Sequence, residues 1–168
     1  VNLTYEDVKN FNYFECRDCK GQGITKDEWS RIHDRFSEYE NILSIEPAVG
    51  AVEAINRLVE VANVHLATSR LPKARKATIE WLELHGFSGL CGLHFLKHGE
   101  KHKALKQFTA AVEDDYDQAL SFATAGGTPC FLMLHPWNSD RPELTNVTRI
   151  ENNWEVLSSK LLDLTRRE

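Results

Sequence analysis

The sequence predicts an α/β protein in which a parallel β-sheet is covered by helices on both faces. From residue 47 onward, short apolar segments alternate with segments of helical periodicity, which is the pattern of repeated βαβ units. Residues 1–46 contain helical and irregular segments but no clear strand. We therefore expect two parts, a small helical cap-like segment over residues 1–46 and an α/β core over residues 47–168.

A helix is expected near the end of the first part. Thr25 and Glu28 have the spacing of a capping box, in which each side chain binds the backbone N–H of the other residue. Large apolar residues follow at intervals of three or four, which places them on one helix face that we expect to be buried. These residues are Trp29, Ile32, Phe36 and Tyr39.

The second part is expected to alternate helices and strands. Its first helix begins with Pro47, a residue type favoured at helix starts, and carries Val49 on its apolar face. The next helix stops at Gly86, the residue type that most often ends a helix. The apolar run over 61–68 is typical of a strand buried on both faces. The expected helices span 47–59, 73–85, 101–108, 116–125 and 153–164, and the expected strands span 61–68, 90–96, 109–112, 130–134 and 147–150.

Composition disfavours several classes of protein. The formal net charge of -5 at pH 7 argues against a surface for nucleic acid polymers or anionic membranes, because both need clustered Lys and Arg. No apolar run approaches the roughly 20 residues of a membrane-spanning helix. The first residues lack the basic and apolar regions of a signal peptide. With four scattered cysteines and no disulfide framework, we expect a cytoplasmic protein.

The cysteines are expected to have no metal-binding role. Residues 16–23 read Cys-Arg-Asp-Cys-Lys-Gly-Gln-Gly, which is one repeat of a zinc-binding pattern. Structural zinc takes four ligands, whereas this repeat offers only Cys16 and Cys19, so we interpret the match as coincidence. Cys91 and Cys130 lie in apolar, strand-like segments and are expected to be small buried hydrophobic residues.

Thr68, Ser69 and Arg70 follow the first apolar strand and precede a helix. Hydroxyl groups and free backbone N–H groups at such a position can bind a phosphate, assisted by the positive end of the helix. The alternative is a helix cap, because Ser and Thr are favoured at helix starts whatever the function. We take these three residues as candidates for substrate binding.

Lys103 lies in a polar segment between a strand and the next helix. A lysine there can pair with a phosphate and neutralise charge that develops during a reaction, which makes it a candidate catalytic residue. The alternative is a solvated surface lysine.

Glu113, Asp114 and Asp115 directly follow the apolar run Ala-Ala-Val. Three neighbouring carboxylates raise one another's pKa unless a cation is present, and hard oxygen ligands suit Mg²⁺. The alternative is that these acids only begin the next helix, where negative charge is favourable. We take all three as candidate metal ligands.

Four segments in this order resemble the haloacid-dehalogenase-like (HAD) superfamily, and within it the 5′-nucleotidase-type and nucleotidase-like members. They are Leu66–Arg70, Lys103–Leu105, Val112–Ala119 and the segment Phe131-Leu-Met-Leu-His-Pro-Trp-Asn138, and the resemblance covers about residues 42–164. It implies a three-layer Rossmann-like fold with a helical cap, a Mg²⁺ cofactor and a small phosphorylated molecule as substrate. In that family Thr68 would contact the phosphate, Lys103 would be the conserved-motif lysine, and Glu113 and Asp114 would be the metal-binding acids.

The sequence departs from this family at its first motif. A strand ending in Asp-x-Asp supplies the nucleophile and the general acid in the family, and no apolar strand with that pattern precedes Thr68. This strand is expected at the centre of the sheet, where its absence would leave two neighbours with unpaired backbone groups. We expect a segment preceding Val1, another chain or a rearranged sheet to fill the gap, which favours strand complementation or a homo-oligomer.

Two functions follow from these observations. The first is a HAD-type, Mg²⁺-dependent phosphatase, in which an aspartate would attack phosphorus and form an aspartyl-phosphate that water then cleaves. Without the nucleophile, this chain is expected to show no appreciable turnover of phosphate esters. The alternative is a non-catalytic module that binds a phosphorylated ligand or a protein partner, and a weaker third reading is an unrelated flavodoxin-like binding domain. The cap aromatics Trp29, Phe36 and Tyr39 are expected to form core rather than a base-stacking surface.

Overall fold

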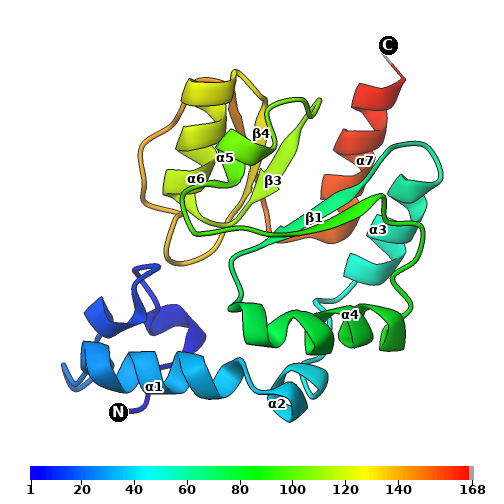
Figure 1. Cartoon of the computed structure of the whole chain (residues 1–168). Helices are drawn as coiled ribbons and strands as arrows, with labels where there is room; N and C mark the ends of the chain where they lie inside the picture. Colours follow the sequence, from blue (N-terminus) through cyan, green and yellow to red (C-terminus); the bar gives the residue numbers. More distant parts are fainter. Residues whose placement is uncertain (167–168) are drawn as a thin grey trace. The chain divides into compact units, whose positions relative to one another are not determined.

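The structure is a computed structural model that describes residues 1–166 (Figure 1). It is mixed α/β, as the sequence predicts, and its strands pair only in parallel. The strands form one two-stranded sheet and one three-stranded sheet. The single sheet expected from the sequence is therefore replaced by two smaller sheets within the described residues.

Backbone contacts divide the chain into two compact units. The first, called here the three-strand unit, contains Val1–Arg35 and Leu105–Asn152. The second, called here the two-strand unit, contains Phe36–Ala104 and Asn153–Glu168. The predicted division into residues 1–46 and 47–168 follows the order of motifs along the chain and stays a prediction. The last two residues of the second predicted part, 167 and 168, lie outside the described residues.

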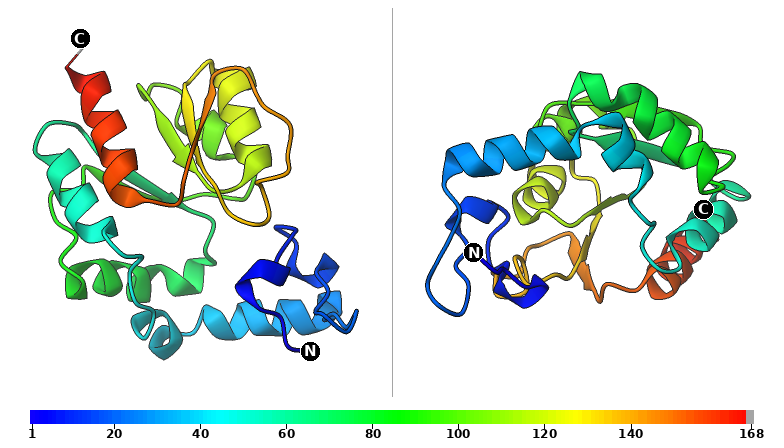
Figure 2. Two further views of the ribbon diagram at one scale, coloured as in Figure 1. Left: turned by 180° about the vertical axis from the view of Figure 1, so that it is seen from behind. Right: turned by 90° about the horizontal axis from the view of Figure 1, so that it is seen from below.

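The three-strand unit is built around its middle strand. The strand order is β3–β4–β5, and all four residues of β4 are buried. Helix α6 packs against β3 and β4 (Figures 1 and 2). The strands are β3 (Ala111–Glu113), β4 (Cys130–Met133) and β5 (Val147–Ile150), and the helical elements are η1 (Tyr5–Asp7), η2 (Tyr13–Glu15), α1 (Lys26–Phe36), α6 (Tyr116–Ser121) and the π-helical turn η4 (Phe122–Gly126).

The two-strand unit pairs β1 with β2. Helix α3 lies beside α7, and α2 lies beside α4 (Figures 1 and 2). A buried cluster of Ile42, Ala74 and Ala77, packed against Trp81, joins α2 to α4. The elements are α2 (Tyr39–Leu43), α3 (Ala51–Val59), β1 (His65–Thr68), η3 (Pro72–Ala74), α4 (Arg75–Leu84), β2 (Gly92–Phe95), α5 (Lys101–Ala104) and α7 (Trp154–Thr165).

Two predicted helix boundaries are confirmed. The Thr25 N–H donates to the Glu28 carboxylate at 2.8 Å, and the Glu28 N–H donates to Thr25 Oγ1 at 3.2 Å, which completes the capping box before α1. Gly86 follows α4 with φ of 76°, and its N–H donates to the Glu83 carbonyl at 3.1 Å. The Phe87 N–H reaches back to the Leu82 carbonyl at 2.9 Å, so α4 ends in a Schellman motif.

The aromatic face predicted over residues 29–39 is wrong in its second half. Helix α1 ends at Phe36, and Tyr39 begins the separate helix α2 because Glu38 adopts an extended conformation between them. Phe36 is 57% exposed and Tyr39 is 39% exposed, so neither is a core residue. Trp29 is half-buried and stacks on Tyr13.

Three other predicted elements differ in length or burial. The first core helix begins at Ala51 rather than Pro47, because Gly50 adopts φ of 77° and ends the preceding turn, which leaves Val49 97% exposed. The helix predicted over 101–108 is limited to Lys101–Ala104. Strand β1 is shorter than predicted and half-buried rather than buried on both faces, as expected for a strand in a two-stranded sheet.

The two apolar-segment cysteines have different environments. Cys130 is buried in β4 as predicted, whereas Cys91 lies just before β2 and is exposed, so its predicted burial is wrong. The longest helix is α7, with 12 residues, and within the described residues no helix is long and apolar enough to cross a membrane.

Candidate functional site

The hydroxyl-bearing loop begins at the last residue of β1. Thr68 Oγ1 accepts a hydrogen bond from the Arg70 N–H at 3.2 Å, so the hydroxyl turns the chain immediately after the strand. Because this contact uses an oxygen lone pair, the hydroxyl hydrogen of Thr68 can still be donated to a ligand. The loop then enters the turn η3 and helix α4.

Ser69, in the middle of this loop, carries a hydroxyl that has no hydrogen-bond partner. Its Oγ atom is buried, yet no described residue pairs with it. An unsatisfied buried polar group costs about 1–3 kcal/mol relative to a paired one, so native structures keep few of them. A bound anion with acceptor oxygens would satisfy this hydroxyl.

Arg70 places a guanidinium next to the same loop. Arg70 Nη1 donates to Thr78 Oγ1 at 3.1 Å, and Thr78 in turn donates to the Ala74 carbonyl at 2.8 Å. Burial lowers the pKa of Arg70 below its ordinary value. No carboxylate pairs with this side chain in the part of the chain that is described. A partly buried cation without a counter-charge is a favourable place for an anion.

Lys103 lies on the short helix α5 in the same unit as this loop. Its backbone N–H donates to the Glu100 carbonyl at 3.1 Å, and its side chain is exposed. Within residues 1–166 its ammonium group forms no ion pair or hydrogen bond. The predicted catalytic lysine is thus an available cation.

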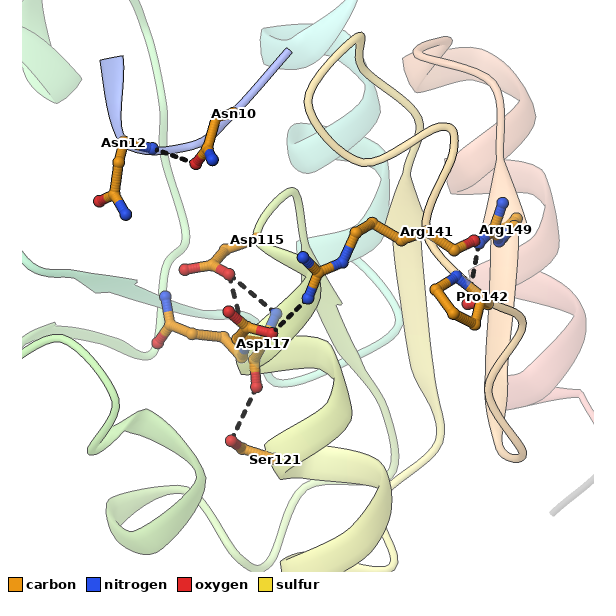
Figure 3. Close-up of polar contacts among 9 residues, drawn as sticks. Asn10, Asn12, Asp115, Asp117, Ser121, Arg141, Pro142 and Arg149 are labelled. Carbon is orange, nitrogen blue, oxygen red and sulfur yellow. Dashed lines mark hydrogen bonds and ion pairs between the residues drawn. The ribbon is translucent and has the colours of Figure 1, made fainter. Parts of the chain in front are cut away.

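The three acids after β3 have separate environments, all within the three-strand unit. Asp115 is buried and caps helix α6, where its carboxylate accepts hydrogen bonds from the N–H groups of Asp117 at 2.9 Å and Gln118 at 3.4 Å (Figure 3). The interpretation that these acids begin the next helix is therefore confirmed for Asp115. Glu113 is buried in the strand, and Asp114 is half-buried.

The main chain of Asp114 is held by two side chains from the segment after β4. Trp137 Nε1 donates to the Asp114 carbonyl at 2.9 Å, and Asn138 Nδ2 donates to the same oxygen at 2.8 Å. Asn138 is fully buried, its Nδ2 also donates to the Met133 carbonyl, and its Oδ1 accepts from the His135 N–H. This arrangement follows from the parallel register, since β3 and β4 end at the same edge of the sheet.

An aromatic cluster lies near Asp114. Tyr5 Oη and His135 Nδ1 are 2.7 Å apart, and the His135 and Trp137 rings stack with centroids 4.2 Å apart. Burial lowers the pKa of His135, while the negative charge of Asp114 partly opposes that shift. Burial raises the pKa of Tyr13, and Asp114 adds to this increase. The sequence analysis included His135 and Trp137 in a motif segment but missed Tyr5 and Tyr13, because these lie more than 100 positions before His135.

Cationic side chains tie the loop after β4 to helix α6. Arg141 Nη2 pairs with Asp117 Oδ1 at 2.9 Å (Figure 3). The Arg141 guanidinium also lies 4.4 Å from the centre of the Tyr116 ring. Arg149 Nη2 donates to the Pro142 carbonyl at 3.0 Å, which holds the same loop against β5. The segment that contacts Asp114 is therefore anchored on both sides.

The donor set allows one Mg²⁺ ligand rather than a complete cage. Among residues 1–166, no group of three or more His, Cys, Asp or Glu side chains could hold a metal ion. Asp115 is engaged in capping and Glu113 is buried in β3, so Asp114 is the most exposed of the three acids. Mg²⁺ commonly takes only one or two protein carboxylates and keeps several waters, so this carboxylate fits the ion as a single ligand.

The structure brings together only part of the predicted site. Thr68, Ser69 and Arg70 share one loop, and Lys103 follows the neighbouring strand in the same unit. Asp114 belongs to the other unit. Comparison of the chain with protein-family models, with curated proteins and with solved structures found no match, so the interpretation of the site rests on its geometry.

Proposed function

We propose that this chain is the core of a HAD-type, Mg²⁺-dependent phosphatase acting on phosphomonoesters of the nucleotide class, and that it lacks the nucleophile needed for turnover. The observation that supports this best is the loop after β1. Ser69 carries a buried hydroxyl without a hydrogen-bond partner, and its chain neighbour Arg70 carries a partly buried guanidinium without a carboxylate. Both deficits are removed by one tetrahedral oxyanion.

Each residue then has a distinct role in the proposal. The Thr68 and Ser69 hydroxyls donate to phosphate oxygens, and Arg70 supplies a charge-assisted hydrogen bond. Lys103 neutralises charge on the phosphoryl group. The Asp114 carboxylate binds Mg²⁺ with water ligands, and the carbonyl contacts from Trp137 and Asn138 fix the backbone that carries it. When bound, Mg²⁺ would supply positive charge at Asp114.

The nucleophile is the missing part of the proposal. None of the strands in the described residues ends in Asp-x-Asp, and the first of them is β1. Strand β1 pairs only with β2, and β3 pairs only with β4, so each has one edge without a strand partner among residues 1–166. In the three-layer HAD-like fold that we propose, an additional parallel strand carrying the nucleophile is supplied by another segment or by a second copy of the chain.

Phosphate binding tests the loop directly. We expect inorganic phosphate to bind in isothermal titration calorimetry, and Arg70→Gln to weaken binding about tenfold, because a charge-assisted hydrogen bond is lost. Lys160→Gln, which removes an exposed charge from α7 in the same unit, is the matched control and should leave the affinity unchanged. Equal affinities for the wild type and Arg70→Gln would contradict the proposal for the loop.

Turnover tests the missing nucleophile. We expect no appreciable hydrolysis of phosphate esters with Mg²⁺ present. Robust Mg²⁺-dependent hydrolysis that is abolished by Asp114→Asn would contradict this expectation and would reveal a nucleophile elsewhere.

A non-catalytic phosphate-binding or protein-binding module is the second candidate, favoured by the same lack of an Asp-x-Asp strand within the described residues. The coding sequence upstream of Val1 discriminates between the two. An apolar strand ending in Asp-x-Asp there would favour the enzyme, whereas a start codon at that point would favour the binding module.

A further inference from the structure

The two segments that follow β1 and β2 carry a local excess of positive charge. Residues 69–76 and 96–104 contain seven Lys and Arg side chains but a single acid, Glu100, in a chain whose formal net charge is -5. The cations are Arg70, Lys73, Arg75, Lys76, Lys97, Lys101 and Lys103. Like charges crowded in this way are unfavourable unless an anion is bound among them.

The parallel register brings these segments to one edge of the two-stranded sheet. Thr68 is the partner of Phe95, and the Leu96 N–H donates to the Thr68 carbonyl at 2.9 Å. Ser69 and Leu96 are the next residues after the two strands, and Lys97 follows Leu96. The segment after β2 therefore starts directly beside the hydroxyl-bearing loop, and both lie within one unit.

Arg75 adds a second fixed cation at this edge. It is the first residue of α4, and its guanidinium lies 4.9 Å from the centre of the Phe95 ring, which places the start of the helix over the end of β2. Neither Arg75 nor Lys97 forms an ion pair among the described residues. Lys76 differs, since it pairs with Glu80 at 3.7 Å.

We propose that Arg75 and Lys97 form a second anion subsite beside the Thr68–Arg70 loop, so that the ligand carries two phosphoryl groups. This inference rests on the proposed phosphate-binding role of that loop. One phosphate dianion is satisfied by the Ser69 hydroxyl and the Arg70 guanidinium, which leaves the charges of Arg75 and Lys97 uncompensated. A second phosphoryl group, as in a pyrophosphate or a bisphosphate, supplies the additional negative charge. The planar guanidinium of Arg75, which lies over the Phe95 ring, can bind two oxygens of this second phosphoryl group at once.

Calorimetric titration with inorganic pyrophosphate and inorganic phosphate, at equal ionic strength, tests the second subsite. We expect pyrophosphate to bind about tenfold more tightly than phosphate, since it gains further charge-assisted contacts. Arg75→Gln and Lys97→Gln should each weaken pyrophosphate binding severalfold while changing phosphate affinity less than twofold. Lys160→Gln should change neither affinity, and far-UV circular dichroism of each variant confirms that it is folded.

Titration with citrate separates a phosphoryl site from a general attraction for polyanions. We expect citrate to bind no more tightly than phosphate, and citrate binding as tight as pyrophosphate would overturn the inference. Equal affinities for phosphate and pyrophosphate, with phosphate binding still dependent on Arg70, would overturn the second subsite alone. If neither anion binds, the proposed function of the loop and the second subsite both fail.

Discussion

Replacement of Asn138 is expected to destabilise the three-strand unit strongly. This side chain is 0% exposed and uses its whole amide, since Nδ2 donates to the Asp114 and Met133 carbonyls, both at 2.8 Å, and Oδ1 accepts from the His135 N–H at 2.9 Å. Asn138→Ala removes all three contacts, whereas Ser139→Ala, at the exposed neighbouring position, serves as the control.

The magnitude follows from counting the groups that lose their partner. The Asp114 carbonyl keeps its contact with Trp137, so only the Met133 carbonyl and the His135 N–H are left without the hydrogen bond that Asn138 supplied. An unsatisfied buried group costs about 1–3 kcal/mol, which gives a loss of about 2–6 kcal/mol in the free energy of unfolding for Asn138→Ala. Ser139→Ala should change it by less than about 0.5 kcal/mol.

Asn138→Asp sharpens the test because it keeps the size of the side chain. At neutral pH a buried carboxylate would face two carbonyl oxygens, so its pKa in the folded state should rise above the unfolded value of about 3.9. Between the unfolded and the folded pKa values, the folded state of Asn138→Asp then binds more protons than the unfolded state. The variant should therefore be more destabilised at pH 7 than at pH 4, measured relative to the wild type at each pH.

Urea unfolding monitored by tryptophan fluorescence measures these differences at the two pH values. If Asn138→Ala unfolds within about 0.5 kcal/mol of Ser139→Ala, the amide contacts do not hold the segment. A pH-independent effect of Asn138→Asp would show that the residue is not buried against carbonyl oxygens.

Three further outcomes are expected. Gly86→Ala should lower the free energy of unfolding by about 1 kcal/mol in urea titrations, because alanine is strained at φ of 76°. The added methyl group itself has no atom within 4 Å. An unchanged free energy of unfolding would refute the left-handed conformation at this helix end. Asn153→Ala should cost about 1 kcal/mol in the same assay by removing the cap that accepts from Glu155 and Val156, whereas Asn153→Asp should retain most of it. His135 should titrate below its ordinary pKa in NMR spectra, and Asp114→Asn should lower that pKa further. Below about pH 6.5 the unfolded state binds more protons at His135 than the folded state does, so acidification lowers stability. His135→Gln should therefore reduce that loss of stability.

The sequence predicted the type of most elements in the second half of the chain because each has a local signal. The helix that stops at Gly86 is marked by a residue whose backbone preference decides the boundary, whereas Asn153, predicted as the first residue of its helix, is the N-cap. The strand predicted over 147–150 matches β5 at both ends. These features depend on few distant contacts.

The errors in the predicted fold occurred where tertiary contacts determine the helix boundaries and the pairing of strands. Periodicity alone extended one helix from Trp29 through Tyr39, but Glu38 leaves the helical conformation, and no local signal of comparable strength marks that position. Pairing of strands is also non-local, so the division into two sheets could not be read from alternation along the chain.

The candidate site was predicted in part for the same reason. Thr68 and Asp114 were identified because polar residues directly follow apolar strands. The hydrogen bonds from Trp137 and Asn138 to Asp114 join positions more than 20 residues apart and became visible only with the register of β3 and β4. The role of Asp115 as a cap required the geometry of helix α6.

The interruption of the three-strand unit by residues 36–104 has a consequence for biosynthesis. A ribosome releases the N-terminal 35 residues well before it reaches residue 152, and at about 5–20 residues per second the interval lasts roughly 6–25 s. Until residues 105–152 emerge, the early segment lacks the neighbours that they supply, and its aromatic side chains are open to chaperones. Translation speed through the intervening stretch is therefore expected to influence the yield of native protein.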